Sequence, residues 1–447
     1  MPIAHHLRTV LKLAQGAALS SLLWASFVST VDAQNLPLHS QHSLYAQDRS
    51  KKALTHVRTD LPVETEELAF LGRSFIVIPW VESPAATTAR DGLGPLFNAN
   101  TCVACHNRNG AGGGYTADGS VPRSTVVQLH YYDQQHGWGG DPVYGPQISI
   151  NGASDVPFEA KYRVTWATNN LDQRLRAPIL EFTQLNYGPL NAHSQPQLIR
   201  APSLMGLGLL QAIPAAQIRA KADADDSNQD SISGRAVEVW SRSTNSYQLG
   251  RFGWKNTTSS IIEQSAKAAH FDMGLRNPLF PEENCTATQS ACQQAHMSKK
   301  LDLPDLRLQA MTIYLQNLKI PKPAKATATT QAGQLLFDQS GCTDCHSNSY
   351  TTNSGQAVHA YTDLLLHDMG PDLAGQGSDA QEWRTSPLWG LGLTKHLSQP
   401  GYLHDGRAAT LNEAILWHGG EAQRSRETYT LLPLAQQQQL LAFLESL

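Results

Sequence analysis

The residues best suited to chemistry are two cysteine pairs, each followed directly by a histidine. Residues 102–106 are Cys-Val-Ala-Cys-His and residues 342–346 are Cys-Thr-Asp-Cys-His. This Cys-x-x-Cys-His pattern is the attachment signature of c-type haem: the two thiols bond to the porphyrin and the histidine binds the iron from the proximal side. At the Cys and His content of this chain, one copy should arise by chance only about 0.003 times.

Other uses of a Cys-x-x-Cys pair fit these residues less well. A zinc site would need two further ligands near each pair, and a thioredoxin-like dithiol would not need the histidine. The sequence therefore predicts two covalently bound haem c groups. Their attachment residues and proximal ligands are Cys102, Cys105 and His106 for the first haem, and Cys342, Cys345 and His346 for the second.

The other two of the six cysteines, Cys285 and Cys292, lie outside the haem motifs. In an oxidising compartment the spacing favours a small structural disulfide that closes a short loop. A redox-active dithiol is the alternative, and nothing nearby in the sequence supports it.

Length and charge limit the class of protein. A chain of 447 residues is long enough for two or three domains. With 34 Lys and Arg against 38 Asp and Glu, the net charge is −4, and no basic block stands out. This balance argues against a nucleic-acid-binding protein. After the N-terminus no apolar run is long enough to span a bilayer.

The N-terminus has the features of a secretory signal peptide. Arg8 and Lys12 supply a positive region, residues 14–28 are mostly apolar, and residues 31–33 are Val-Asp-Ala, which fits a cleavage site. We expect residues 1–33 to be removed on export, so that the mature chain has no membrane span. In a Gram-negative cell the protein would be periplasmic. A buried first helix or an uncleaved membrane anchor is the alternative.

The elements that must position the two motifs suggest a chain built mainly from α-helices. Residues 34–64 are polar and are expected to be flexible, residues 65–320 to form an N-terminal haem domain, and residues 321–331 to be a linker. Residues 332–447 are expected to form a C-terminal cytochrome c domain, with a short helix at 332–337 before the motif and a closing helix at 436–447.

The N-terminal haem domain is expected to carry insertions. Residues 124–132 and 162–168 are rich in β-branched and aromatic side chains and suggest a β-hairpin. A glycine-rich loop at 109–114 is expected to wrap one haem edge. Residues 200–208, Arg-Ala-Pro-Ser-Leu-Met-Gly-Leu-Gly, recur at 384–392 as Arg-Thr-Ser-Pro-Leu-Trp-Gly-Leu-Gly. This repeat, downstream of each motif, predicts two tandem cytochrome c-type domains.

An acidic segment between the motifs could bind calcium. Asp226, Asn228, Asp230 and Ile232 place oxygen atoms at alternate positions, as a calcium loop does. The glycine usual in such loops is replaced by Ser231. A solvated acidic turn is the alternative.

Several of these segments together resemble the bacterial dihaem cytochrome c peroxidase/MauG superfamily. They are residues 384–392, Leu-His-Asp-Gly-Arg at 403–407, Thr-Leu-Asn-Glu-Ala-Ile at 410–415, and the segments 416–422 and 250–255. Within the superfamily the chain is most similar to the dihaem oxidoreductase branch, whose members are described as peroxidases. The resemblance covers roughly residues 65–447.

The resemblance implies an electron-entry haem in the C-terminal domain and a peroxidatic haem in the N-terminal domain, with a calcium ion often between them. It also implies a tryptophan relay between the haems, without indicating which of the nine tryptophans serves. In the superfamily the distal ligand of the C-terminal haem lies eight residues after the threonine of the Thr-Leu-x-Glu motif. Counting from Thr410 gives His418, and Met369 is the rival. An imidazole there would make this haem six-coordinate and low-spin.

At the N-terminal haem the resemblance points to acid–base residues beside an open iron. Glu263 and Gln264 match a Glu-Gln pair of the superfamily, and Asp272 stands where a catalytic glutamate is expected. Such a residue moves a proton between the peroxide oxygens as their bond breaks. Asp272 could instead cap a helix, and His270 could occupy the iron.

The sequence thus favours an exported dihaem oxidoreductase that reduces hydrogen peroxide with electrons from a small redox protein. A non-catalytic dihaem electron-transfer cytochrome is the main alternative, and an oxidase of a thiol or other organic substrate is a third. A homodimer is implied by the resemblance alone.

Overall fold

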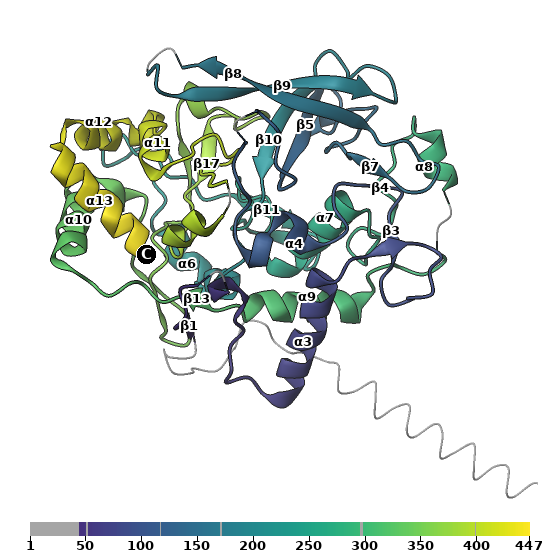
Figure 1. The fold of residues 1–447 in the computed structure, drawn as a ribbon, viewed down its shortest axis with the longest axis horizontal. Helices are drawn as coiled ribbons and strands as arrows, with labels where there is room; N and C mark the ends of the chain where they lie inside the picture. The colour runs from purple at the N-terminus through teal and green to yellow at the C-terminus, as the bar shows by residue number, and fades with distance from the viewer. Residues whose placement is uncertain (1–43, 51, 117, 170–171, 296–297, 398) are drawn as a thin grey trace, which may run out of the picture.

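The computed structural model describes residues 44–447 except 51, 117, 170–171, 296–297 and 398, so the predicted signal peptide lies outside the described residues. The fold is more mixed than the expected mainly α chain, with 31% helix and 20% strand, and its strands form many small sheets. Two groups of helices lie side by side, and a long two-stranded ribbon extends over both (Figure 1).

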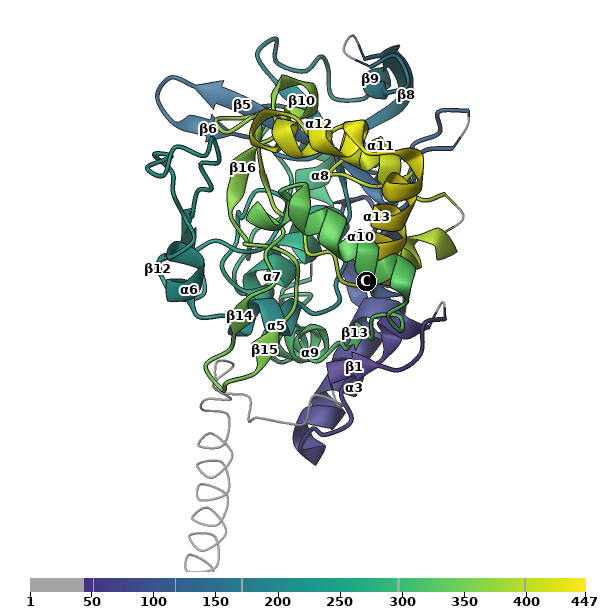
Figure 2. The same cartoon turned by 90° about the vertical axis from the view of Figure 1, so that its left-hand side faces the viewer.

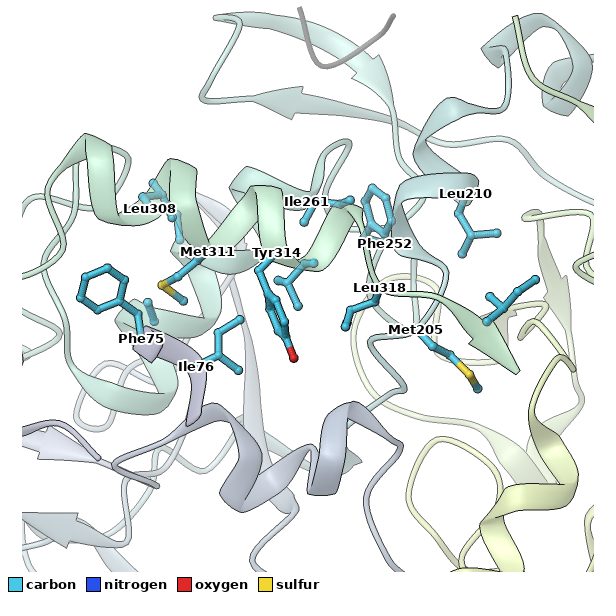
Figure 3. Packing of buried hydrophobic residues seen from close by; sticks show 14 of the residues in the cluster. Phe75, Ile76, Met205, Leu210, Phe252, Ile261, Leu308, Met311, Tyr314 and Leu318 are labelled. Carbon is cyan, nitrogen blue, oxygen red and sulfur yellow. The ribbon is translucent and has the colours of Figure 1, made fainter. Parts of the chain in front are cut away.

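The N-terminal group of helices is built on a crossing between α3 (Val63–Val77) and α9 (Asp305–Gln316). Gly72 makes the crossing possible, since a Cβ atom at this position would lie 1.9 Å from the carbonyl oxygen of Ala310. Phe75, Ile76, Met311 and Tyr314 fill the core around this contact (Figure 3). The first motif follows α3 and packs against this group.

The C-terminal group repeats this crossing with different residues. Helix α10 (Ala328–Gln339) packs on α13 (Leu434–Ser446), and a Cβ atom at Gly333 would lie 1.9 Å from the carbonyl oxygen of Gln439. These helices confirm the two predicted from the sequence, although α10 begins earlier, at a threonine cap, Thr327. The second motif follows α10, as the first follows α3.

The short sequence repeat also has the same structure in both groups. Gly206 (φ 69°) precedes α5 (Leu207–Ala212), and Gly390 (φ 68°) precedes the 3-10 helix η5 (Leu391–His396). The backbone of both glycines is in the left-handed region, a conformation that costs glycine little. The glycine two residues later packs on the closing helix of its own group, Gly208 on α9 and Gly392 on α13.

A third matching pair consists of α7 (Ile261–Met273) and α11 (Leu411–Leu416). Ser260 and Thr410 cap these helices, each accepting a hydrogen bond from the backbone N–H of a glutamate three residues later. Each cap follows a loop closed by one antiparallel bridge, Phe252 to Thr258 and Tyr402 to Ala408. The chain is therefore internally duplicated well beyond the nine residues of the sequence repeat.

The predicted strands of the insertion exist, but their predicted pairing is wrong. Strand β5 (Thr125–Asp133) pairs with β10 (Gln195–Arg200) and β6 (Gly137–Gly139), all antiparallel. Strand β8 (Ala160–Thr168) pairs with β9 (Arg176–Leu185) instead of β5. The insertion is thus a three-stranded sheet and a separate two-stranded ribbon, and not one hairpin.

The β8–β9 ribbon reaches from the N-terminal group to the C-terminal group, where it lies beside α11 (Figures 1 and 2). At its tip Leu175 is 3% exposed and packs in a cluster with Leu373, Ala414, Leu416 and Trp417. A residue of the insertion therefore completes the core beside α11.

Leu175→Ala is expected to lower the free energy of unfolding by about 2–5 kcal/mol, because it leaves a cavity in this cluster. Ile179, on the same ribbon but 46% exposed, is the matched control, and Ile179→Ala should change stability by no more than about 0.5 kcal/mol. Denaturant unfolding measures both. Equal changes in the free energy of unfolding would show that Leu175 contributes no more to stability than the exposed Ile179.

Within the segment 34–64, which the sequence predicts to be flexible, some of the described residues form regular structure. Strand β1 (Tyr45–Ala46) pairs in parallel with β13 (Ile320–Pro321), and Leu44, Ala46 and Ala53 are buried. The expected linker, residues 321–331, starts at the last residue of β13 and ends within α10. Because β1 pairs with β13, the N-terminal segment packs where the chain passes from one group of helices to the other.

The predicted disulfide between Cys285 and Cys292 is present. Within the described part of the chain, no helix has the length and apolar character that crossing a membrane requires. The remaining elements are short: β2 (Val81–Glu82), β3 (Asp91–Leu93), β4 (Leu96–Phe97), α4 (Cys102–Cys105), β7 (Asn151–Gly152), α6 (Ala215–Arg219), β11 (Glu238–Ser241), β12 (Ser246–Leu249), α8 (Ser290–Gln294), β14 (Tyr350–Thr351), β15 (Ala357–Val358), β16 (Leu366–Asp368), β17 (Glu382–Arg384) and α12 (Gln423–Leu431), with 3-10 helices η1 (Ala53–Thr55), η2 (Asn107–Asn109), η3 (Cys342–Asp344), η4 (Pro371–Leu373) and η6 (Gly420–Ala422).

Candidate functional site

The second motif lies on the 3-10 turn η3 at the wall of a large cavity. Cys342, Cys345 and His346 all line this cavity, whose volume is about 340 Å³, within the range usual for a cofactor pocket. The Nδ1–H of His346 donates a hydrogen bond to the carbonyl oxygen of Tyr361 at 2.9 Å. This bond fixes the ring and leaves Nε2 as the nitrogen able to bind a metal.

His418 lines the same cavity, directly after α11. Its Nδ1–H donates to the carbonyl oxygen of Ala414 at 2.7 Å, so its Nε2 is likewise the nitrogen left for a ligand. Burial lowers the pKa of His418, and burial, with His418 itself as a further cause, lowers the pKa of His346 to about 4. Both rings are therefore neutral at neutral pH, the form in which imidazole binds a metal.

The rest of the wall suits a porphyrin. Two thiols and two imidazoles share a cavity with apolar side chains from both ends of the C-terminal group. These apolar residues are Phe337, Leu388, Leu391, Leu411, Ile415, Leu440 and Leu444. Met369, the rival ligand, also lines the cavity, so the two candidate side chains share one space.

The first motif occupies α4, whose cap is the side chain of Thr101. The Nδ1–H of His106 donates to the carbonyl oxygen of Pro202 at 2.7 Å, and burial lowers the pKa of His106 to about 4. Burial raises the pKa of the Cys102 and Cys105 thiols to about 12, and Asp272 contributes to both shifts. The first motif therefore offers two thiols and a neutral imidazole whose Nδ1 is already hydrogen-bonded. This set of donor groups also fits a covalent haem.

Asp272, the predicted acid–base residue, lies close to this first motif at the C-terminal end of α7. The Nε2–H of Gln147 donates to its Oδ1 at 2.7 Å. Burial raises the pKa of Asp272 to about 6, although the bond from Gln147 and the charge of Lys267 act in the opposite direction. A carboxyl group with such a pKa can both accept and release a proton near neutral pH.

The structure does not bring Glu263 and Gln264 to Asp272. These residues belong to the first turn of α7 and Asp272 to its last, about 13 Å away along the helix axis. Glu263 is buried and accepts hydrogen bonds from the hydroxyls of Ser241 and Ser259 and from the N–H of Ser243. Gln264 accepts one from the Thr258 hydroxyl. Glu263 therefore holds a turn and the start of the helix, as Glu413 does in α11.

His270, the alternative iron ligand, packs in an aromatic cluster. Its ring stacks on Phe280 at 5.2 Å and meets Phe271 edge-on. Burial, with Arg242 as a lesser cause, lowers the pKa of His270 to about 4. The ring therefore already has a packing role on α7.

The duplication shows which side chain of α7 corresponds to His418. Eight residues after the cap Thr410 is His418, and eight residues after the cap Ser260 is Ala268. An alanine has no atom that can bind a metal. The sequence already held this signal, because Ser260 and Glu263 have the same spacing as Thr410 and Glu413. The contact between Gln147 and Asp272 could not be predicted in this way, because the two residues are 125 positions apart in the chain.

The two groups of helices are joined by a reciprocal contact that starts from the sequence repeat. Arg200 donates through its backbone N–H to the carbonyl of His404 (2.7 Å) and through Nε to that of Leu403 (3.1 Å). Arg384, the repeat equivalent of Arg200, donates in the same way to the carbonyls of Trp254 (2.8 Å) and Gly253 (2.9 Å). Each arginine thus holds the loop before the capped helix of the other group.

Trp254 lies at this contact and lines the cavity together with Trp383 and Trp389. Its indole N–H donates to the carbonyl oxygen of Arg200 at 2.7 Å. The cavity continues from His418 past these rings to Asn107 and Arg108, directly after the first motif. Trp254 is therefore hydrogen-bonded to a residue of each group of helices, Arg200 and Arg384.

Two predicted segments remain, the acidic segment at 226–232 and the glycine-rich loop at 109–114. In the acidic segment, Asp226 accepts from the N–H of Ser231, and Asp230 from Ile232 N–H and Asn228 Nδ2–H, all exposed. The glycine-rich loop lines the cavity at Gly110, while Gly114 contacts the backbone of residues 399–401. The loop therefore also contributes to the contact between the groups.

Comparison with known proteins finds a protein family that matches the chain. A family model described as "Di-haem oxidoreductase, putative peroxidase" matches residues 198–447, more than half of the chain. No curated protein matches. Among solved structures, the chain is similar to one chain of Kuenenia stuttgartiensis hydrazine synthase pressurized with 20 bar xenon. The identity is 14%, the alignment covers 94% of this chain and 97% of that chain, and the TM-score is 0.37, too low to carry an argument.

Proposed function

The chain belongs to the di-haem oxidoreductase family, and from this premise we propose that it is an exported dihaem peroxidase. Membership makes it a redox protein with two haems, for which residues 102–106 and 342–346 are the fitting attachment sites. We propose that each duplicated group is a cytochrome c-type domain and that the protein works in the periplasm. Its electrons would come from a small redox protein.

One observation carries the proposal: the position eight residues after the helix cap holds different side chains in the two groups. The C-terminal group has His418 facing the cavity of His346, whereas the N-terminal group has Ala268 at the equivalent position. We propose that His346 and His418 would both hold the second haem iron. The first would be held by His106 alone, with its other face open to a small oxidant.

The residues around the first motif can supply the proton chemistry that peroxide reduction needs. Cys102, Cys105 and His106 would hold the haem, which would supply the electrons, so that H₂O₂, two electrons and two protons give two waters. Asp272 would accept the proton from one peroxide oxygen and return it to the other as the O–O bond breaks. Gln147 orients this carboxyl group, and Lys267 favours its ionised form.

Electrons would pass from the C-terminal haem to the N-terminal haem by way of Trp254. Its ring lines the cavity between the two motifs, and hydrogen bonds to Arg200 and Arg384 fix it in place. Calcium at Asp226, Asn228 and Asp230 stays a hypothesis that this mechanism does not use.

Peroxide consumption by the purified holoprotein tests the proposal. With a reduced small cytochrome as donor, hydrogen peroxide should be consumed with two donor electrons per molecule. If the donor reduces both haems but peroxide oxidises neither, the protein is an electron carrier and the proposed activity is wrong. Peroxide-independent oxidation of added thiols would support the third alternative instead.

A further inference from the structure

A buried histidine lies between two carboxylates beside the second motif. His367, on β16, places Nε2 at 2.7 Å from Oδ2 of Asp363 and Nδ1 at 2.5 Å from Oε2 of Glu421. The three side chains are 3%, 4% and 9% exposed. None of these residues belongs to the mechanism proposed above.

The geometry requires a charged ring. A carboxylate only accepts hydrogen bonds, so both ring nitrogens must carry a proton, and only the imidazolium form has two N–H groups. Burial alone would lower the pKa of His367, but the hydrogen bonds to Asp363 and Glu421 raise it. The charge of Asp363 also counteracts the lowering of the Arg384 pKa by burial.

This cluster is better explained as an ion-pair network than as a metal site. Cys345, Asp363 and His367 bring ligand atoms within 4.8 Å of one another, as a metal site would. Both nitrogens of His367 are already bonded to carboxylates, however, and Cys345 belongs to a haem-attachment motif. No ring nitrogen is therefore left for an ion.

The network connects the chain segment near His346 with the segment that contains His418. Nδ1 of His367 lies 3.8 Å from Sγ of Cys345, the residue before His346. Asp363 follows Tyr361, whose carbonyl holds the His346 ring, by two residues. On the opposite side, Glu421 follows His418 by three residues and is also held by the Ser233 hydroxyl at 2.8 Å.

We propose that His367 is a positioning residue for the C-terminal haem, holding the His346 segment and the His418 segment at the separation that lets both rings bind one iron. The proposal rests on the ligand assignment above. Removing one partner from a buried ion network leaves its other charges without compensation, so the segments would move apart or take up water. Because Glu421 is close to His418 in the chain, the position of His418 should change more than that of His346.

The test is low-temperature EPR of ferric holoprotein carrying His367→Gln, with haem content measured in parallel. Glutamine is uncharged and has its donors on a single nitrogen, so it cannot replace the two ring nitrogens that face Asp363 and Glu421. We expect the C-terminal haem to lose much of its low-spin signal and gain a high-spin signal, with two haems still attached. Glu421→Gln, which keeps the size of the side chain, should change the signal in the same direction and serves if His367→Gln does not fold.

Two further variants make the result specific. Ser233→Ala removes one hydrogen bond to Glu421 but no charge, and should keep the wild-type signal. His418→Ala should remove the low-spin signal of this haem completely. If His418→Ala has this effect while both network variants keep the wild-type spectrum, His367 has no positioning role. If His418→Ala changes nothing, the ligand assignment itself is wrong.

Discussion

The His418→Ala variant should convert the ferric C-terminal haem from low-spin to high-spin. His418 and His346 line one cavity, each with Nδ1 bonded to a backbone carbonyl, so the two remaining nitrogens are available for one iron. Without the second imidazole the iron would be five-coordinate or bind water, a weaker ligand. We expect loss of nearly all the low-spin EPR intensity of this haem, with both haems still attached.

Met369→Leu is the matched control, because Met369 lines the same cavity and is the rival ligand. The replacement conserves volume closely and should leave the low-spin signal in place. A low-spin signal that survives in His418→Ala but is lost in Met369→Leu would reverse the assignment.

The Asp272→Asn variant should slow peroxide reduction by about 10²- to 10⁴-fold, the usual contribution of an acid–base residue. Asparagine keeps the size of the side chain and can still bond to Gln147, but it cannot accept the peroxide proton. Haem content and the low-spin signal should stay unchanged. Asp155→Asn changes an exposed aspartate in the segment before β8, is the control, and should keep the wild-type rate. Equal rates in the two variants would remove the proposed role of Asp272.

The pH dependence provides an independent check on the same residue. Burial raises the pKa of Asp272 to about 6, and the ionised form is the one that accepts a proton. The wild-type rate should therefore rise as the pH increases through about 6 and level off above it. In Asp272→Asn this rise should be absent, whereas a rise at the same pH would assign it to another group.

Local patterns were the part of the molecule that the sequence predicted well. The haem motifs, the helices around residues 332–337 and 436–447, and the disulfide depend on near neighbours in the chain, and the structure places them as expected. The strands at β5 and β8 were also found. Their pairing was not, because β5 pairs with a strand more than sixty residues later and nothing in either sequence specifies that partner.

The site shows the same limit. Glu263 matched a catalytic motif, yet its oxygens accept hydrogen bonds from Ser241 and Ser259 and so hold the turn before α7, a role that only the contacts reveal. Asp363, His367 and Glu421 form one ion network from three separate segments, so the spacing of charged residues could not indicate it. The difference between Ala268 and His418 could have been found from the sequence, by aligning the two capped helices.

The account depends on one haem with both faces occupied and one haem with an open face. Low-temperature EPR of the ferric wild-type holoprotein, with the spins of each signal quantified, measures this directly. We predict one low-spin and one high-spin haem per chain, with hydrogen peroxide altering the high-spin signal. Two low-spin haems per chain, both unchanged by peroxide, would contradict the account.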